Sequence, residues 1–255
     1  MESDFLGVPE IGIWLFFGLA AASFLTTFFG VTTGAAGGLL LLLILATVFP
    51  PVILIPLHTL VQLGGNIGRI VLMRHHILTP LLLPFTIGSV IGGVTGAQIF
   101  VSLPAGLLQG IIAVFVLFAL WLPKVGTFGP ERGRFALLGF LATFLGVFVS
   151  ATGTLVTPFL ASATPDRRKY VATFGAVMAI VHMSKVVAFG LAGVVIGAYL
   201  PLIAAMIGTT VLATWLGSMT LDRVPERLFR IVLKVILSLL ALRLLWVAAR
   251  AAEIF

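Results

Sequence analysis

Ten apolar segments separated by short polar breaks make up most of this chain and limit what it can fold into. Most of them approach the ~20 residues that an α-helix needs to cross about 30 Å of hydrocarbon. They lie at roughly 11–31, 35–49, 52–73, 79–101, 104–122, 135–150, 153–164, 170–191, 196–217 and 228–248. Each is too continuous for a strand of an outer-membrane barrel, which alternates over ~10 residues. The segments therefore predict an all-α polytopic membrane protein.

The composition supports the same class. Of the 255 residues, 60% are hydrophobic and only 9% are charged, and the mean hydropathy is +1.25. A soluble domain carries about 25% charged residues. The chain has no cysteine, which excludes disulfides and cysteine-based metal sites. The first ten residues contain Glu2, Asp4 and Glu10 but no basic residue, so we expect the first segment to be a retained helix rather than a secretory signal.

The basic residues are grouped in alternate loops. If the N-terminus is outside, the inside loops hold Arg74, Lys124, Arg168 and Arg223, and the outside loops near Pro50, Ser102 and Gly193 carry no charge. This is the distribution that the positive-inside rule requires. We therefore predict that both termini lie outside, and we read the net charge of +7 as a sign of orientation rather than of nucleic-acid binding.

The chain repeats itself after 116 residues. Residues 24–31 and 140–147 are identical at six of eight positions. The ungapped register then pairs Gly37 with Gly153, Asn66 with His182, and Arg69 with Lys185. Each half holds five segments, so the second half would enter the membrane from the opposite face, as in inverted-repeat transporters. We predict a first repeat over 1–122, a cytoplasmic linker over 123–134 and an inverted second repeat over 135–255.

Two of the segments are short, about 12–15 residues, and each follows a glycine-rich break at 34–38 or 150–154. We interpret them as broken or re-entrant helices, whose N-terminal N–H groups and dipoles favour an anion. Glycines there let the backbone approach a ligand closely, and threonines add hydroxyl donors. The alternative is that small residues only allow close helix packing, and we prefer that alternative for Gly88, Gly92 and Gly96.

One apolar segment carries a column of polar side chains. His58, Gln62, Asn66 and Arg69 are spaced by four, four and three residues, which places them on one face of a helix. Arg69 lies near the end of its segment and could instead snorkel to the membrane surface. Lys185, its counterpart in the second half, lies some fifteen residues into an apolar segment, and intramembrane cations are candidates for a functional site.

None of the eight acidic residues lies within an apolar segment. Fixed cations without fixed anions predict a small anionic substrate. Intramembrane hydrolysis needs clustered metal ligands or carboxylates, so we expect no enzyme activity, no metal and no cofactor. Proton coupling would have to use His182, His58, Lys185 or the substrate itself. The alternative is that His182 is a neutral hydrogen-bonding residue in the place of Asn66.

Taken together, the two glycine-rich breaks, the duplication and the polar helix resemble the TauE/SafE family of sulfite-exporter-like permeases. The likeness covers nearly the whole chain. The family often has a proline where Leu42 or Leu43 stands, and glycines where Ser150 and Thr154 stand. The resemblance implies a carrier in the bacterial inner membrane for small sulfur-containing or organic anions.

We therefore predict a secondary carrier that exports sulfite or an organosulfonate such as sulfoacetate. Its substrate-binding residues would be Thr33, Gly34, Gly37, Gly38, Gln62, Asn66, Arg69, Thr152, Gly153, Thr154, His182 and Lys185. Three alternatives stay open: an uptake permease for another small oxyanion or a carboxylate, an anion channel, and a structural subunit without transport activity. Besides the substrate, the expected partners are the lipid bilayer and a second copy in a homodimer, with no nucleic acid.

Overall fold

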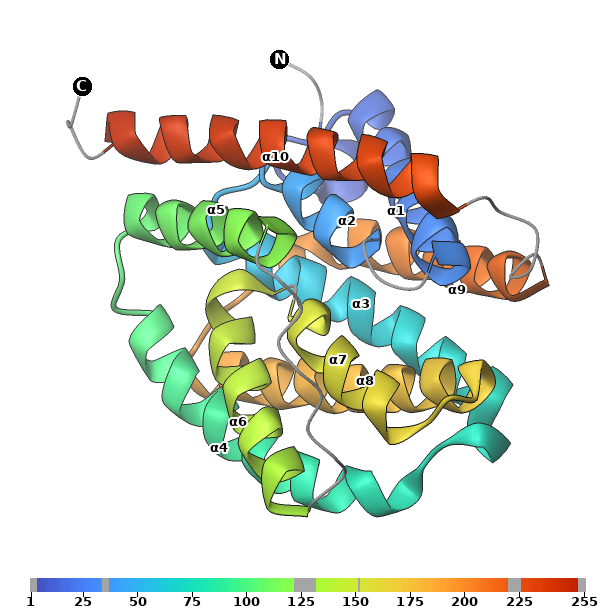
Figure 1. Cartoon of the computed structure of the whole chain (residues 1–255). Coiled ribbons are helices and arrows are strands. Elements are labelled where there is room, and N and C mark those ends of the chain that lie inside the picture. The colour runs from blue at the N-terminus through green and yellow to red at the C-terminus, as the bar shows by residue number, and fades with distance from the viewer. Residues whose placement is uncertain (1–3, 34–36, 122–131, 151, 220–225, 252–255) are drawn as a thin grey trace.

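The computed structural model describes residues 4–33, 37–121, 132–150, 152–219 and 226–251, which fold into helices joined by short connections (Figure 1). The first half contains α1 (Ile13–Thr33), α2 (Gly37–Leu45), α3 (Pro51–Met73), α4 (Leu82–Phe100) and α5 (Ala105–Trp121). The second half contains α6 (Arg132–Val149), α7 (Gly153–Ala163), α8 (Arg167–Leu191), α9 (Leu200–Met219) and α10 (Glu226–Ala251). These helices match the ten predicted segments one for one, and no strand occurs among the described residues.

Length and composition confirm a polytopic membrane protein. Within the described ranges, five stretches are long and apolar enough to cross a membrane: Ile13–Val31, Pro51–His76, Thr79–Phe100, Arg168–Leu191 and Gly197–Gly217. The shorter apolar helices include α7, with 11 residues. α2 has nine residues, fewer than predicted. It ends in a turn that the N–H of Phe49 closes on the carbonyl of Leu45 at 2.8 Å, because the residue before Pro50 is disfavoured in the α conformation.

The start of α8 is fixed by a side-chain cap. Asp166 precedes the helix, and its Oδ1 accepts hydrogen bonds from the N–H groups of Lys169 at 3.2 Å and Arg168 at 2.8 Å. Both bonds satisfy N–H groups that have no partner within the helix. The Lys169 N–H is the main cause that holds the pKa of the Asp166 carboxyl below its usual value.

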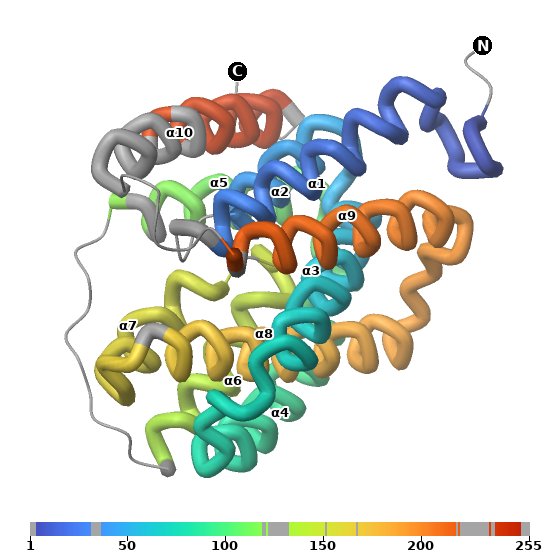
Figure 2. The backbone as a smooth tube through the Cα atoms, turned by 90° about the vertical axis from the view of Figure 1, so that its right-hand side faces the viewer, coloured from blue at the N-terminus to red at the C-terminus, as the bar shows by residue number. Residues whose placement is uncertain are grey.

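α3 and α8 are the central helices, and they pack against each other (Figure 2). α3 also packs on α9, and α8 packs on α4. The remaining large contacts join α1 to α9, α4 to α6 and α5 to α10. When each helix number is shifted by five, the α3–α9 pair becomes α8–α4 and the α1–α9 pair becomes α6–α4. The α3–α8 and α5–α10 pairs become themselves. A chain built from two five-helix repeats predicts this pairing.

Glycines bring α4 and α6 into close contact. A Cβ added at Gly88 would meet the carbonyl of Ala136, and one at Gly92 would meet the carbonyl of Phe140. From the other helix, a Cβ added at Gly139 would meet the carbonyl of Phe85. The prediction that the Gly88–Gly92–Gly96 face serves helix packing is confirmed, and the contact lies within one chain.

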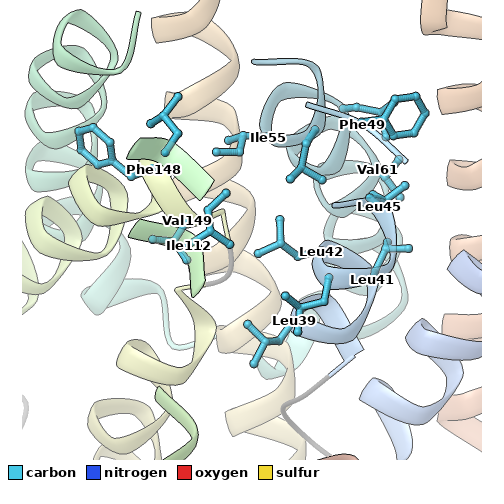
Figure 3. Packing of buried hydrophobic residues seen from close by; sticks show 14 of the residues in the cluster. Leu39, Leu41, Leu42, Leu45, Phe49, Ile55, Val61, Ile112, Phe148 and Val149 are labelled. Carbon is cyan, nitrogen blue, oxygen red and sulfur yellow. The ribbon is translucent and has the colours of Figure 1, made fainter. Parts of the chain in front are cut away.

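The larger apolar core surrounds α2. Leu42 is fully buried, and Ile112 of α5 and Val149 of α6 lie together on one side of it (Figure 3). Leu39, Leu41 and the other leucines of the helix belong to the same cluster. This core fixes α2 beside α3, so that its N-terminal glycines lie next to the polar column of α3.

Candidate functional site

A small cavity of about 80 Å³ lies where the two short helices begin. This volume is several times the ~10–15 Å³ that one water molecule needs. The lining residues come from α1, α2, α3, the α6–α7 break, α7 and α8. They are Thr27, Gly30, Gly37, Gly38, Leu39, Gln62, Asn66, Arg69, Ser150, Gly153, Thr154, Phe174, Met178 and His182.

The two halves of the chain contribute equivalent positions to this cavity. Four pairs of lining residues are separated by the repeat distance of 116: Gly37 and Gly153, Gly38 and Thr154, Gln62 and Met178, and Asn66 and His182. The cavity therefore lies at the interface between the predicted repeats. In transporters built from internal repeats, the substrate binds at this interface.

α2 and α7 both direct their N-termini at the cavity. Gly37 and Gly38 form the first turn of α2, and Gly153 and Thr154 form the first turn of α7. N–H groups in a first turn have no acceptor within the helix. The Thr152 side chain makes no capping bond at α7. Both helix ends therefore offer backbone donors and a positive dipole end to a bound anion.

Gly37 allows α1 and α2 to approach each other closely. A Cβ added at Gly37 would meet the carbonyl of Thr26 and would lie 2.8 Å from the Cα of Gly30. At Gly38 an added Cβ would meet the side-chain amide of Gln62, which is the end of a flexible side chain and can move. The close approach between α1 and α2 therefore depends on Gly37, because every other residue type carries a Cβ.

Three buried polar atoms of residues that line the cavity have no hydrogen-bond partner among the described residues. They are Arg69 Nε, Thr154 Oγ1 and His182 Nδ1. Buried polar atoms in native proteins are nearly always paired with protein, water or a ligand. Arg69 Nε is a donor and the Thr154 hydroxyl can donate, so this set suits a ligand that accepts hydrogen bonds.

Arg69 extends toward α8 rather than along the membrane surface. Its aliphatic chain lies over Gly175, where an added Cβ would be 2.8 Å from Arg69 Cδ. The same side chain lines the cavity. The partly exposed side chain of Arg69 therefore lies between α3 and α8, at the cavity.

Lys185 is placed differently from its repeat counterpart. Its side chain is fully buried and does not line the cavity. The Nζ atom donates to the Oγ of Ser150 at 2.9 Å. Thr152 lies nearby, since an added Cβ at Gly146 would be 3.2 Å from Thr152 Oγ1 and 3.7 Å from Lys185 Cδ. Lys185 and Thr152 thus lie in a layer behind the cavity wall.

Ser150 joins this layer to the cavity. Its φ of 60° is in the left-handed region, which glycine adopts without steric cost. Its Oγ lies 2.8 Å from His58 Nδ1, and His58 Nε2 lies 2.9 Å from the carbonyl of Gly38. His58 therefore connects the two helix breaks. Neither His58 nor Ser150 is among the predicted substrate-binding residues, although the glycines common at position 150 in the family signal an unusual backbone conformation there.

The structure brings most of the predicted site residues together. Those that line the cavity are Gly37, Gly38, Gln62, Asn66, Arg69, Gly153, Thr154 and His182. Thr152 and Lys185 lie behind it, Thr33 ends α1, and the Thr33 side chain and Gly34 are outside the described residues. The described residues contain no group of three or more side chains suited to a metal ion.

Comparison with known proteins identifies the family. Residues 19–244 match the family described as "Sulfite exporter TauE/SafE". No curated protein and no solved structure matches the chain. The match spans the cavity, both helix breaks and all but the ends of the helical bundle. The chain therefore belongs to the TauE/SafE family of membrane transporters.

Proposed function

We propose that the protein is a secondary carrier that exports a small sulfur-containing oxyanion, such as sulfite or sulfoacetate, across a bacterial inner membrane. The observation that carries the proposal is the convergence of donors on one cavity. Arg69, two helix N-termini and unpaired side-chain atoms of Thr154 and His182 meet there. Among the described residues, no aspartate or glutamate lines the cavity. An oxyanion accepts several hydrogen bonds and carries a negative charge that would pair with Arg69.

The size and chemistry of the cavity favour a compact anion over a large organic one. A cavity of about 80 Å³ has room for one sulfur-centred oxyanion group. Met178 and Phe174 form a less polar part of its wall, which would accommodate the carbon chain of a short organosulfonate. Arginine suits such groups because its planar fork binds oxyanions in a bidentate manner.

Alternating access would come from the two repeats moving against each other, with the second repeat inverted relative to the first. The equivalent residues that line the cavity support this mechanism. In the described structure, α2 packs on α1, α3 and α10, and its leucines belong to the same apolar cluster as residues of α5 and α6. Exchange between the two open states would require α2 to shift within this cluster.

The test is a transport assay in proteoliposomes with sulfite, thiosulfate, sulfoacetate, sulfate and carboxylates. We expect saturable uptake of a sulfur oxyanion and counterflow exchange, in which unlabelled anion on one side drives labelled anion from the other. Liposomes with the Arg69→Ala variant serve as the control. Currents without saturation or counterflow would establish a channel instead, and selective carboxylate transport would overturn the substrate class.

A further inference from the structure

We propose that His58 is a proton-binding site that is linked to anion binding through the hydroxyl of Ser150. The inference rests on the proposed function and extends it, because it names the ion that accompanies the anion. It is carried by a buried hydrogen-bonded chain that runs from Lys185 through Ser150 and His58 to Gly38.

The direction of each bond in this chain follows from its end point. The carbonyl of Gly38 can only accept, so His58 Nε2 carries a hydrogen. In the neutral ring, Nδ1 is then an acceptor, and the hydroxyl of Ser150 donates to it at 2.8 Å. Ser150 Oγ in turn accepts from Lys185 Nζ. The single hydroxyl proton of Ser150 is therefore used by His58 and is not offered to the cavity.

A proton on His58 reverses the middle bond. Both ring nitrogens of an imidazolium are donors, so Nδ1 must donate to Ser150 Oγ. The hydroxyl then accepts from His58 and Lys185, and its own hydrogen no longer points to the ring. Its possible acceptors are Thr59 Oγ1, 3.3 Å away, and an anion in the cavity that Ser150 lines. One proton is bound in total: the hydroxyl passes its hydrogen to Nδ1 and takes another from the cavity side. The site thereby gains a donor for an anion.

The surrounding charges link the proton to the anion. On α8, His182 and Lys185 face His58, whose ring centroid is 6.5 Å from that of His182. On α3 itself, Arg69 lines the same cavity. The packed helices α2, α5 and α9 contain no titratable side chain in their described ranges. The other titratable residues of the helices packed against α3 lie near helix ends: Arg74, His75 and His76 after α3, Arg132 and Arg134 in α6, and Arg167, Arg168, Lys169 and Tyr170 in α8.

His58 and its neighbours thus form a cluster of cations and neutral rings without a carboxylate. An imidazolium at His58 adds one more positive charge beside Lys185, and the repulsion between like charges is strong in a poorly solvated interior. An anion in the cavity is the group that offsets this repulsion. The proton and the anion are therefore expected to bind together.

The same geometry distinguishes His58 from His182. His182 Nδ1 is buried and has no partner within the described structure. His182 lines the cavity directly, at the position equivalent to Asn66. It can therefore contact an anion as a neutral group, but it has no relay through a second side chain. The coupling proton is therefore assigned to His58, because both of its ring nitrogens are hydrogen-bonded.

The test measures anion affinity of the purified full-length protein between pH 5 and pH 8. Thiosulfate and sulfate are the probes, because these anions of strong acids do not themselves take up a proton in this range. Sulfoacetate is left out of this measurement because its carboxylate begins to take up a proton at the low end of the range. The variants are His58→Gln, which offers an amide in place of a titratable ring, and Ser150→Gly, which removes the hydroxyl and suits the φ of 60°. His182→Asn is the matched control.

For the wild type, we expect affinity to fall by up to about tenfold per pH unit on the alkaline side, as linkage to one proton requires. His58→Gln and Ser150→Gly should bind with an affinity that is independent of pH, and His182→Asn should keep the wild-type dependence. If the wild type binds an anion with an affinity that does not depend on pH, the inference is overturned and the proposed function stands. An unchanged dependence in His58→Gln or Ser150→Gly would overturn the proton site or the relay. If none of the anions binds, the proposed function fails first and the inference fails with it.

Discussion

Arg69 and Lys185 are 116 residues apart at equivalent positions of the repeat, yet only Arg69 lines the cavity. Lys185 is fully buried behind the wall and donates to Ser150 at 2.9 Å. The two cations therefore act at different distances from a bound anion. In the proposed mechanism, Arg69 would contact the anion, and Lys185 would be a positioning residue that acts through Ser150.

Removing Arg69 should weaken anion binding. Loss of a charge-assisted hydrogen bond costs about 1.5–3 kcal/mol, so Arg69→Ala should lower the affinity roughly 10- to 150-fold. Arg243→Ala is the control, because Arg243 lines a separate cavity with Gln109 between α2, α5 and α10. Titration calorimetry on both purified variants would measure the effect. An equal loss in the two variants would mean that overall charge, rather than the site, governs affinity.

The glycine contact between α4 and α6 should matter for stability. Gly92→Ala would place a Cβ against the carbonyl of Phe140, and overpacking of this kind costs typically 1–3 kcal/mol. Gly208, the repeat equivalent of Gly92, has open space around an added Cβ. We expect Gly92→Ala to lower the thermal unfolding midpoint in detergent and Gly208→Ala to leave it within error. Similar midpoints for both variants would contradict the close contact.

The orientation of the chain can be tested by single-cysteine labelling, since the sequence contains no cysteine. We expect Arg168→Cys to react with an impermeant reagent only from the cytoplasmic side. Ser102→Cys should react only from the outside. Inverted and right-side-out vesicles provide the two conditions. Labelling of position 168 from outside would rule out the predicted orientation and the inverted repeat with it.

The cap at Asp166 should contribute stability that depends on pH. The carboxylate accepts from Lys169 and Arg168, and these bonds lower its pKa in the folded protein. Because the folded pKa is below the unfolded value of about 3.9, the contribution is complete above that value and is lost as pH falls through the folded pKa.

Asp166→Asn should retain the cap and remove this pH dependence, because asparagine also caps helices well. Asp166→Ala should lower the unfolding midpoint at neutral pH. Thermal unfolding of the three proteins between pH 3 and pH 7 would measure both effects. If lowering the pH reduces the unfolding midpoint of the wild type no more than that of Asp166→Asn, the carboxylate charge does not contribute to the cap.

The sequence predicted the helix order well, because the length and continuity of an apolar segment report directly on whether a helix can span a membrane. It also predicted most of the cavity. The spacing of Gln62, Asn66 and Arg69 fixes one helix face through local geometry alone, and the repeat points to His182 on the other central helix. The end of α2 was less predictable, because its last turn depends on Pro50 and on packing.

Only the tertiary structure decided which polar residues meet. Local spacing places Lys185 and His182 on one face of α8, but the crossing of α3 and α8 determines which of them reaches the cavity. The role of Ser150 depends on three segments far apart in the chain, which bring His58, Lys185 and the start of α2 around one hydroxyl. Such contacts are set by how helices cross, and the period of a sequence carries no information about the crossing.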